Sequence, residues 1–278
     1  GATRRLGRVD HQDAFLDTDE QERARGITIF SKQAELALPE ASITFLDTPG
    51  HVDFSAEMER TLQVLDFALL LVSGTDGVQS HTRTLWQLLR RYRIPTFLFV
   101  NKMDLPGKGK DGIMEELRRE LSEGCVAFDE ETAALYEELA LFDEGLMEQV
   151  LETGKLEDAQ IAELIASRRV FPCFFGAALR MEGVDGLLSA LQRYTKEPKY
   201  PDDFSAQVYK IARGEKDERL TFLKVTGGTL AVKQVLRGED WEEKADQLRL
   251  YSGSKFTLLQ AAPAGTICAV TGLNQTQA

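Results

Sequence analysis

Short apolar runs alternate with helical patterns over the first two-thirds of the chain. In the clearest helical pattern, apolar side chains from Leu85 to Tyr92 recur at the i, i+3, i+4, i+7 spacing of one helix face, and the pattern stops before Pro95. Strands that alternate with helices predict a parallel, doubly wound sheet. The predicted strands are residues 43–46, 67–72, 96–100 and 170–175.

The pattern changes after the proline-containing stretch 196–203. From there, short β-rich runs such as 207–211 and 219–225 are separated by glycines, and another apolar run follows at 265–270. This pattern predicts a second, all-β domain that begins near residue 203.

Polar clusters follow three of the predicted strands. They are Asp47–His51, Asn101–Asp104 and Gly176–Ala178. Ligands of doubly wound sheets bind beyond the carboxyl ends of the strands, so the three clusters predict one shared site.

Negative charge is concentrated in one segment. The chain has a net charge of −12, and residues 111–163 hold 17 acidic against 3 basic residues, a balance of −14. Such a chain is not expected to coat nucleic acid on its own. The helical runs 115–121 and 133–139 predict an acidic helical insert on the surface, and an ordinary solvated helix face is the simpler alternative.

The remaining composition excludes several classes of protein. The three cysteines, Cys125, Cys173 and Cys268, form no C-x-x-C pair and have apolar neighbours, which predicts buried thiols rather than metal ligands. Apolar runs stay shorter than the roughly 18 residues that span a bilayer, and the N-terminal stretch lacks the apolar core of a secretory signal. A cytoplasmic protein without a membrane partner is expected.

The most specific motif is Asn101-Lys102-Met103-Asp104, the pattern that reads guanine in GTPases. A carboxylate at Asp104 can accept from both N1–H and the exocyclic amine of guanine, a pair of donors that adenine lacks. Asn101 would brace the loop and the base, and the stem of Lys102 would cover the ring. A polar turn after a strand is the structural alternative.

Asp47-Thr48-Pro49-Gly50-His51 follows the first predicted strand. A nucleotide hydrolase needs a carboxylate there for the Mg²⁺ shell and a glycine whose N–H approaches the γ-phosphate. These roles fall to Asp47 and Gly50, and His51 would orient the attacking water. A Pro-Gly turn with a surface histidine is the alternative.

Arg25-Gly26-Ile27-Thr28 precedes another probable strand. The Thr28 hydroxyl could complete the Mg²⁺ shell, and its backbone could sense the γ-phosphate in a loop that orders when GTP binds. An exposed loop that enters a strand would look the same.

Together, these three motifs closely resemble the translational GTPases of the elongation factor G group. Residues 77–84 and 208–211 are more similar to the tetracycline-resistance ribosomal protection branch of that group. The resemblance covers nearly the whole chain, and the acidic segment is its least specific part. It implies GTP or GDP and Mg²⁺ as cofactors, the ribosome as partner, and hydrolysis that the ribosome triggers.

The resemblance also implies a fold. Residues 1–200 are expected to form a G domain of the P-loop NTPase type, with the acidic insert at about 111–163, and residues 203–278 a translation-factor β-barrel that is truncated. Ala177 and Ala178 stand where the family usually has Ser-Ala. We expect the Ala178 N–H to keep the contact with guanine O6.

One family element has no counterpart in the sequence. A phosphate loop reads Gly-x-x-x-x-Gly-Lys followed by Ser or Thr, and the nearest match, 107–111, follows the guanine motif and has Asp after the lysine. The resemblance places the true loop and a central strand just before Gly1. We therefore expect a fragment of a longer protein, in which two inner sheet edges lack their shared neighbour.

Three functions remain open at this point. The first is a GTPase of the ribosomal protection type, impaired in this fragment by the absence of the loop. The second is a translocation factor of the elongation factor G type. The third is a non-catalytic ribosome-binding module with a vestigial nucleotide site. The acidic segment is a candidate contact for a ribosomal stalk protein.

Overall fold

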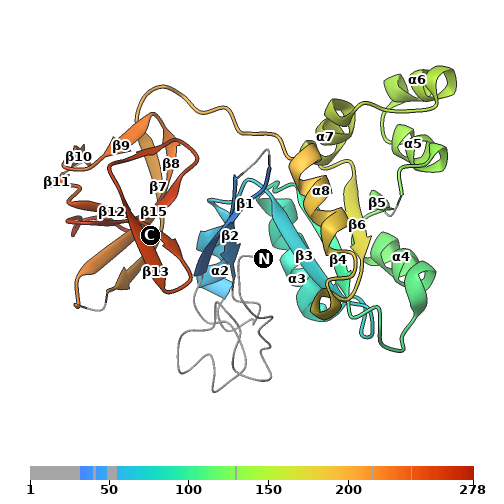
Figure 1. Ribbon diagram of the computed structural model, residues 1–278, viewed down its shortest axis with the longest axis horizontal. Coiled ribbons are helices and arrows are strands. Elements are labelled where there is room, and N and C mark those ends of the chain that lie inside the picture. Colours follow the sequence, from blue (N-terminus) through green and yellow to red (C-terminus); the bar gives the residue numbers. More distant parts are fainter. Residues whose placement is uncertain (1–31, 40–41, 49–54, 129, 215, 239) are drawn as a thin grey trace. The chain divides into compact units, whose positions relative to one another are not determined.

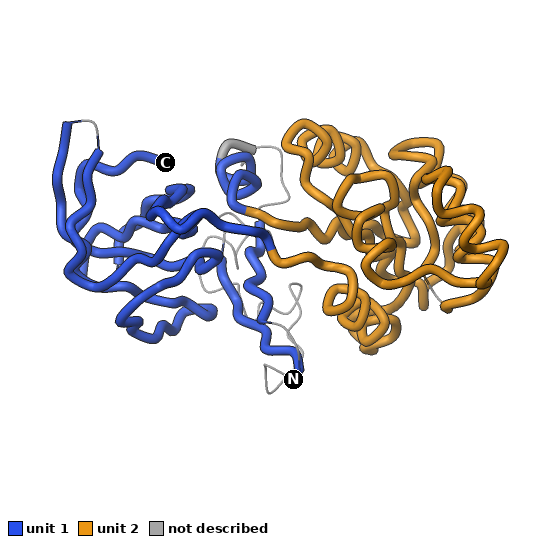
Figure 2. Tube along the Cα trace, turned by 90° about the horizontal axis from the view of Figure 1, so that it is seen from above, with its two compact units in different colours: residues 1–64, 198–278 blue, residues 65–197 orange. Residues whose placement is uncertain are grey.

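The computed structural model describes residues 32–39, 42–48, 55–128, 130–214, 216–238 and 240–278 (Figure 1). The chain divides into two compact units, shown in different colours in Figure 2. We call residues 65–197 the α/β unit. Residues 1–64 together with 198–278 are the β unit, and each unit is described by itself.

The α/β unit is built around a parallel sheet of the order β3-β4-β6-β5. Its strands are β3 (Ala68–Ser73), β4 (Thr96–Asn101), β5 (Cys125–Ala127) and β6 (Phe171–Phe175). Its helices are α3 (Ser80–Arg91), α4 (Gly109–Glu120), α5 (Ala133–Ala140), α6 (Glu144–Thr153), α7 (Asp158–Ala166), the short 3₁₀ helix η3 (Ala178–Arg180) and α8 (Val184–Tyr194).

Helices cover both faces of this sheet. Successive side chains of a strand point to opposite faces, so Phe171 and Phe174 of β6 face different layers. The ring of Phe171 meets Trp86 of α3 at 4.7 Å, whereas Phe174 faces the α8 side, where it lines a cavity together with Ala190. The expected doubly wound arrangement is confirmed.

The β unit contains a five-stranded antiparallel sheet of the order β13-β12-β15-β8-β7. A large cluster of buried side chains forms its core, among them Val225, Leu248 and Val270, each 0% exposed. The strands after residue 200 are β7 (Ser205–Arg213), β8 (Arg219–Gly227), β9 (Thr229–Ala231), β10 (Val235–Arg237), β11 (Glu242–Lys244), β12 (Gln247–Ser252), β13 (Lys255–Leu259), β14 (Ala261–Pro263) and β15 (Ile267–Thr271). The predicted all-β region is confirmed.

The first predicted strand lies outside the parallel sheet, which corrects the expectation that all four runs share it. Residues 42–47 form β2 (Ser42–Asp47), which pairs antiparallel with β1 (Lys32–Ala37). This hairpin packs within the β unit, where the Gly253 N–H donates to the Gln33 carbonyl at 2.8 Å and the Gln33 amide donates to the Ile267 carbonyl at 3.1 Å. Helix α2 (Ser55–Leu62) belongs to the same unit.

Strand β3 is at the edge of the parallel sheet among the described residues. Among the described residues, β3 pairs only with β4, and β2 pairs only with β1. Leu71, in the middle of β3, is 60% exposed although its neighbours Leu70 and Val72 are buried.

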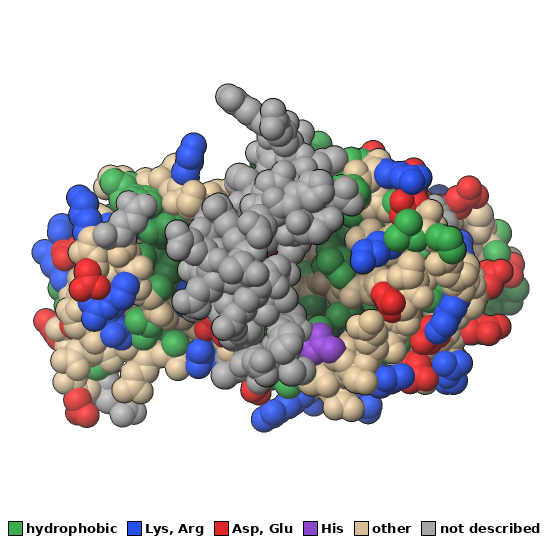
Figure 3. Space-filling model, turned by 90° about the horizontal axis from the view of Figure 1, so that it is seen from below, with side chains coloured by type: hydrophobic (Ala, Val, Ile, Leu, Met, Phe, Trp, Pro, Cys, Tyr) green, Lys and Arg blue, Asp and Glu red, His purple; other side chains and the backbone are tan. Residues whose placement is uncertain are grey.

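Surface charge is mixed on the face seen in Figure 3, where acidic and basic side chains are interspersed over the described surface. Within the acidic segment, Arg118 and Arg119 pair with glutamates, so part of the negative charge is neutralised locally. In the part of the chain that the structure describes, every helix is too short or too polar to cross a bilayer.

Candidate guanine-nucleotide site

The guanine motif begins at the last residue of β4, at the carboxyl edge of the parallel sheet. Residues 97–100 of β4 are at most 2% exposed, because the strand is buried on both faces, and Asn101 is the first residue to emerge. The next strand in the sheet, β6, ends beside it, and the Met103 N–H donates to the Gly176 carbonyl at 3.0 Å. The fold therefore brings the motifs after β4 and β6 together, as predicted.

The Asn101 side chain holds these two loops in register. Its Oδ1 accepts from the Lys102 N–H at 2.8 Å and from the Ala178 N–H at 2.9 Å. One amide oxygen thus fixes both the turn after β4 and the start of η3. The sequence predicted that Asn101 braces the loop and the base; these two hydrogen bonds concern the loops, and the role toward the base stays a prediction.

Lys102 adopts a left-handed backbone conformation with φ of 64°. Such a φ is uncommon for a residue with a side chain, and it marks a turn whose shape is imposed by its surroundings. The neighbouring loop after β3 supplies Asp76, and hydrogen bonds from Ser73 and then Thr75 lower the pKa of its carboxyl, with a smaller contribution from the charge of Lys102. An anionic side chain therefore lies near the lysine.

Asp104 carries the carboxylate that the sequence assigned to the base. Its Oδ2 lies 3.1 Å from Nη2 of Arg180, with the Asp104 side chain 19% exposed and the Arg180 side chain 59% exposed. Arg180 ends η3 and was not predicted as a site residue. The only available signal was a basic residue two positions after Ala178, and that is too common to single out.

Ala177 is buried and Ala178 is half-buried at the start of η3. The Ala177 N–H donates to the Glu182 carbonyl at 3.1 Å, and the Ala178 N–H donates to Asn101. In this structure the Ala178 donor is therefore committed to the loop brace. Its expected contact with guanine O6 stays a prediction.

The residues predicted for the phosphate end are placed only in part. Asp47 is the last residue of β2 and is partly buried, in the β unit. Thr28, Gly50 and His51 lie outside the described residues. The structure brings together the loops after β4 and β6, and the predicted site shared with Asp47 stays a prediction.

No group of three or more His, Cys, Asp or Glu side chains is placed to hold a metal within the described ranges. Magnesium in nucleotide sites takes one or two protein oxygens together with phosphate oxygens and water, so a single carboxylate such as Asp47 is a suitable kind of ligand. The three cysteines are free and buried, as expected.

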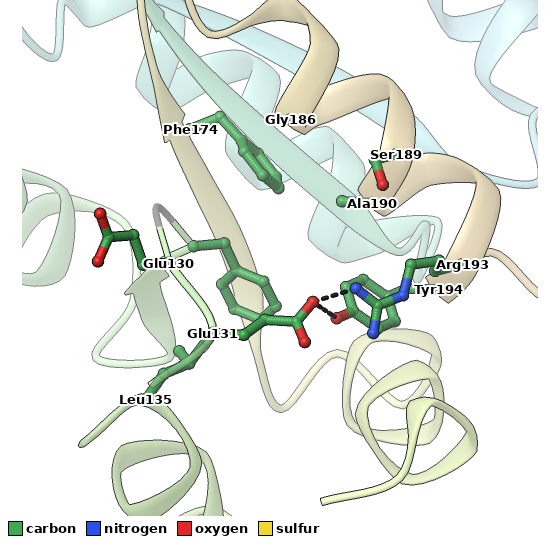
Figure 4. Close-up of a pocket in the computed structure, with 10 residues that line it drawn as sticks. Glu130, Glu131, Leu135, Phe174, Gly186, Ser189, Ala190, Arg193 and Tyr194 are labelled. Carbon is green, nitrogen blue, oxygen red and sulfur yellow. Dashed lines mark hydrogen bonds and ion pairs between the residues drawn. The ribbon is translucent and has the colours of Figure 1, made fainter. Parts of the chain in front are cut away.

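A cavity of about 330 Å³ lies elsewhere on the α/β unit, between α8 and the loop after β5 (Figure 4). Phe128 and Phe174 line it, and at its mouth the Arg193 guanidinium is held between Glu131 and Asp158. None of the predicted site residues lines it. We treat it as separate from the guanine motif.

Comparison with known proteins places the chain in a family. Residues 1–197 match the family described as elongation factor Tu GTP binding domain. The chain is 33% identical to an oxytetracycline resistance protein of Streptomyces rimosus over 98% of this chain and 47% of that protein. It is 32% identical to the tetracycline resistance protein TetP of Clostridium perfringens over 100% of this chain and 47% of that protein.

The fold is shared with a solved structure from Thermus thermophilus. The two superpose with a TM-score of 0.86 at 22% identity, over 98% of this chain and 48% of the other. The chain spans about half the length of the curated relatives it matches. The predicted resemblance to translational GTPases, and to their tetracycline-resistance branch, is confirmed. The chain belongs to the family of elongation factor Tu GTP-binding domains.

Proposed function

We propose that this chain supplies the guanine-reading half of a GTP-binding and GTP-hydrolysing translation factor that acts on the ribosome. The observation that carries the proposal is the joint placement of Asn101, Asp104 and Ala178 at the ends of two neighbouring parallel strands. A polar turn of no function would not need one amide oxygen to hold both loops.

The chemistry of this half follows from its donors and acceptors. The Asp104 carboxylate has two oxygens for the two N–H donors on one edge of guanine, and Arg180 contacts only one of them. A base without these donors would leave the poorly solvated carboxylate with Arg180 as a partner but with no partner on the base, and an unmet buried acceptor costs about 1–3 kcal/mol. The residues present therefore fit a guanine base.

For the phosphate half we propose Thr28 and Asp47 as ligands of the Mg²⁺ shell, the Gly50 N–H as a γ-phosphate donor and His51 as the group that orients water. Hydroxyl and carboxylate oxygens are the ligands that Mg²⁺ prefers. The ion would neutralise phosphate charge, and the work of these side chains is to position the reacting groups.

The proposed biological role is protection of the ribosome from tetracycline, with action in the cytoplasm. It rests on relatives named tetracycline resistance proteins at about 30% identity. A translocation factor is the alternative within the same class. A resistance assay with and without the full gene separates the two, and unchanged growth in the drug would count against protection.

For the acidic segment we propose a protein contact, with a ribosomal stalk protein as the candidate. Leu141 and Leu151 are 71% and 77% exposed among acidic neighbours. Deletion of the whole segment would be a poor test, because Ile113 and Leu117 of α4 are fully buried. Substituting the exposed glutamates by Gln is sharper, and unchanged ribosome-stimulated turnover would exclude the contact. Four exposed glutamates near the two leucines serve for this test, namely Glu137, Glu144, Glu148 and Glu152.

The experiment that tests the proposal is a titration of fluorescent GDP with Mg²⁺. It compares this chain with a version extended upstream by about 20 residues, enough for one strand and a phosphate loop. Tight, guanine-specific binding by the extended form alone supports the proposal and the impairment of the shorter chain. If both forms fold and neither binds GDP, the enzyme proposal is wrong, and a ribosome-binding module takes its place.

A further inference from the structure

A buried carboxylate on α4 contacts two loops at the edge of the parallel sheet. Glu116 is 8% exposed on the core-facing side of the helix, next to Leu117, which is fully buried. Its Oε1 accepts from the Val78 N–H at 3.3 Å, and its Oε2 lies 2.7 Å from Lys108 Nζ. Val78 follows β3, and Lys108 follows the guanine motif. We call residues 74–78 and 101–108 the paired loops.

The paired loops also touch each other directly. The Gly74 N–H donates to the Asn101 carbonyl at 2.7 Å. A Cβ on Gly107 would lie 2.6 Å from the Gly74 carbonyl oxygen, so the two backbones approach too closely for a side chain at that position. The first loop is therefore in contact with both ends of the segment that carries Asp104.

The Glu116 carboxylate also lies against the turn at position 77. Gly77 has φ of 71°, and a Cβ there would lie 2.3 Å from Glu116 Oε2. The carboxylate thus fills the space beside a left-handed turn. Burial of a charged group is costly unless it is paired and hydrogen-bonded, and Glu116 has both kinds of partner.

We propose that Glu116 is a positioning residue for guanine recognition. By holding Val78 on one side and Lys108 on the other, it clamps the paired loops and thereby fixes the segment from Asn101 to Asp104. Glu116 is separated from the base by the loops and acts through them. The proposal rests on the proposed guanine site and goes beyond it, because it assigns part of the binding energy to a residue outside the motif.

The first arm of the test needs no nucleotide. Backbone hydrogen exchange is measured by mass spectrometry on the wild type and on Glu116→Gln, Glu116→Ala and Lys108→Met. Glu115→Gln is the matched control, because Glu115 is the exposed neighbour on the same helix. Faster exchange confined to peptides over residues 74–78 and 101–108 is expected in the three variants and absent in the control. Exchange equal to the wild type, or raised uniformly over the α/β unit, overturns the proposal.

The second arm measures dissociation of fluorescent GDP from the same variants, in the form of the protein that binds it. Glu116→Ala should speed release about tenfold, the size expected for loss of hydrogen bonds to a buried charged group. Glu116→Gln and Lys108→Met should each speed release by less than this. The double variant Glu116→Gln/Lys108→Met should release GDP no faster than the faster of these two single variants, because both substitutions remove the same ion pair. Unchanged release in folded variants overturns the proposal.

The two measurements distinguish a failure of this inference from a failure of the proposed function on which it rests. If the wild type binds no guanine nucleotide in any form, the proposed function fails, and the exchange arm alone decides whether Glu116 clamps the loops. If GDP binds tightly and release is insensitive to Glu116, the guanine site stands and the positioning role is wrong.

Discussion

At the scale of single residues, the Asp104 carboxylate is paired with Arg180. The pair is a single contact at 3.1 Å, and the arginine side chain is more than half exposed. Exposed ion pairs contribute about 0.2–1 kcal/mol. Arg180 therefore competes with a guanine base only weakly, and it keeps the carboxylate turned toward η3.

Removal of this competitor gives the first prediction. Arg180→Ala should tighten GDP binding by up to about fivefold, the upper limit that such a pair allows. Isothermal titration of the nucleotide-binding form measures the change. Arg213→Ala is the control, since Arg213 is also exposed and paired with an aspartate, in the other unit. Weaker binding in Arg180→Ala would mean that the arginine supports the bound base.

The sequence could predict the site residues that form a motif, and it could not predict those that act through the fold. Asn101 and Asp104 could be proposed because a polar tetrapeptide after an apolar strand has a recognisable chemistry. Glu116 looked like one of many acidic residues on a helix. Its position between Ile113 and Leu117, on the apolar side of the helix, was the signal that could have found it.

At the scale of elements, α5 is held at its start by a side-chain cap. The Thr132 hydroxyl accepts from the Leu135 N–H at 3.3 Å. Thr132→Ala should lower the free energy of unfolding by about 1 kcal/mol, and Thr132→Ser should leave it nearly unchanged, because the hydroxyl is kept. Urea denaturation measures both. Equal loss in the two variants would show that the methyl group, not the cap, matters.

Neighbouring strands β5 and β6 bury two of the three thiols. Burial raises the pKa of Cys173 well above its usual range, and a hydrogen bond with Cys125 adds to this. Burial also raises the pKa of Cys268, in β15, to about 12. The thiolate is the reactive form and appears only as pH rises through these values.

A thiol reagent at pH 8 should therefore label no cysteine in the native protein and all three after denaturation. Counting the labelled thiols by mass spectrometry checks this. Rapid labelling of one native thiol would show that its strand opens to solvent.

The elements themselves were mostly predictable, and their pairing was less so. Apolar runs located β3, β4 and β6 because each strand is a continuous run of apolar residues in the sequence. The strand β5 was missed because three residues, Cys125–Ala127, are too short to form a pattern. The strand after Thr28 was expected, but its antiparallel pairing with β2 was not predicted, since pairing is a long-range property that local periodicity does not contain.

At the scale of the whole molecule, each compact unit has its own core. Leu248 is fully buried within the core of the β unit. Leu248→Ala should destabilise that unit by about 2–5 kcal/mol through lost burial and a cavity. Hydrogen exchange should quicken over residues 205–273, while peptides of the α/β unit keep their wild-type rates. Faster exchange in both units would show that they unfold together.

The boundary between domains is a case where sequence and packing give different divisions. The sequence predicts a G domain over residues 1–200, and the family match covers residues 1–197. By packing, the hairpin β1–β2 and helix α2 cluster with the strands after residue 198. Sequence similarity follows evolutionary descent and packing follows contacts, so the predicted boundary near residue 200 stays a prediction.

The most direct test of the guanine site replaces the Asp104 carboxylate by an amide, whose hydrogen-bonding groups complement xanthine instead of guanine. An amide at position 104 keeps an acceptor for N1–H and gains a donor, which suits the C2 carbonyl of xanthine and opposes the amine of guanine. In the nucleotide-binding form of the protein, Asp104→Asn should weaken GDP binding about 100-fold and favour xanthosine diphosphate over GDP. Binding of both nucleotides is measured by displacement of a fluorescent analogue. If Asp104→Asn binds GDP as the wild type does, Asp104 does not read the base, and the account of this site is wrong.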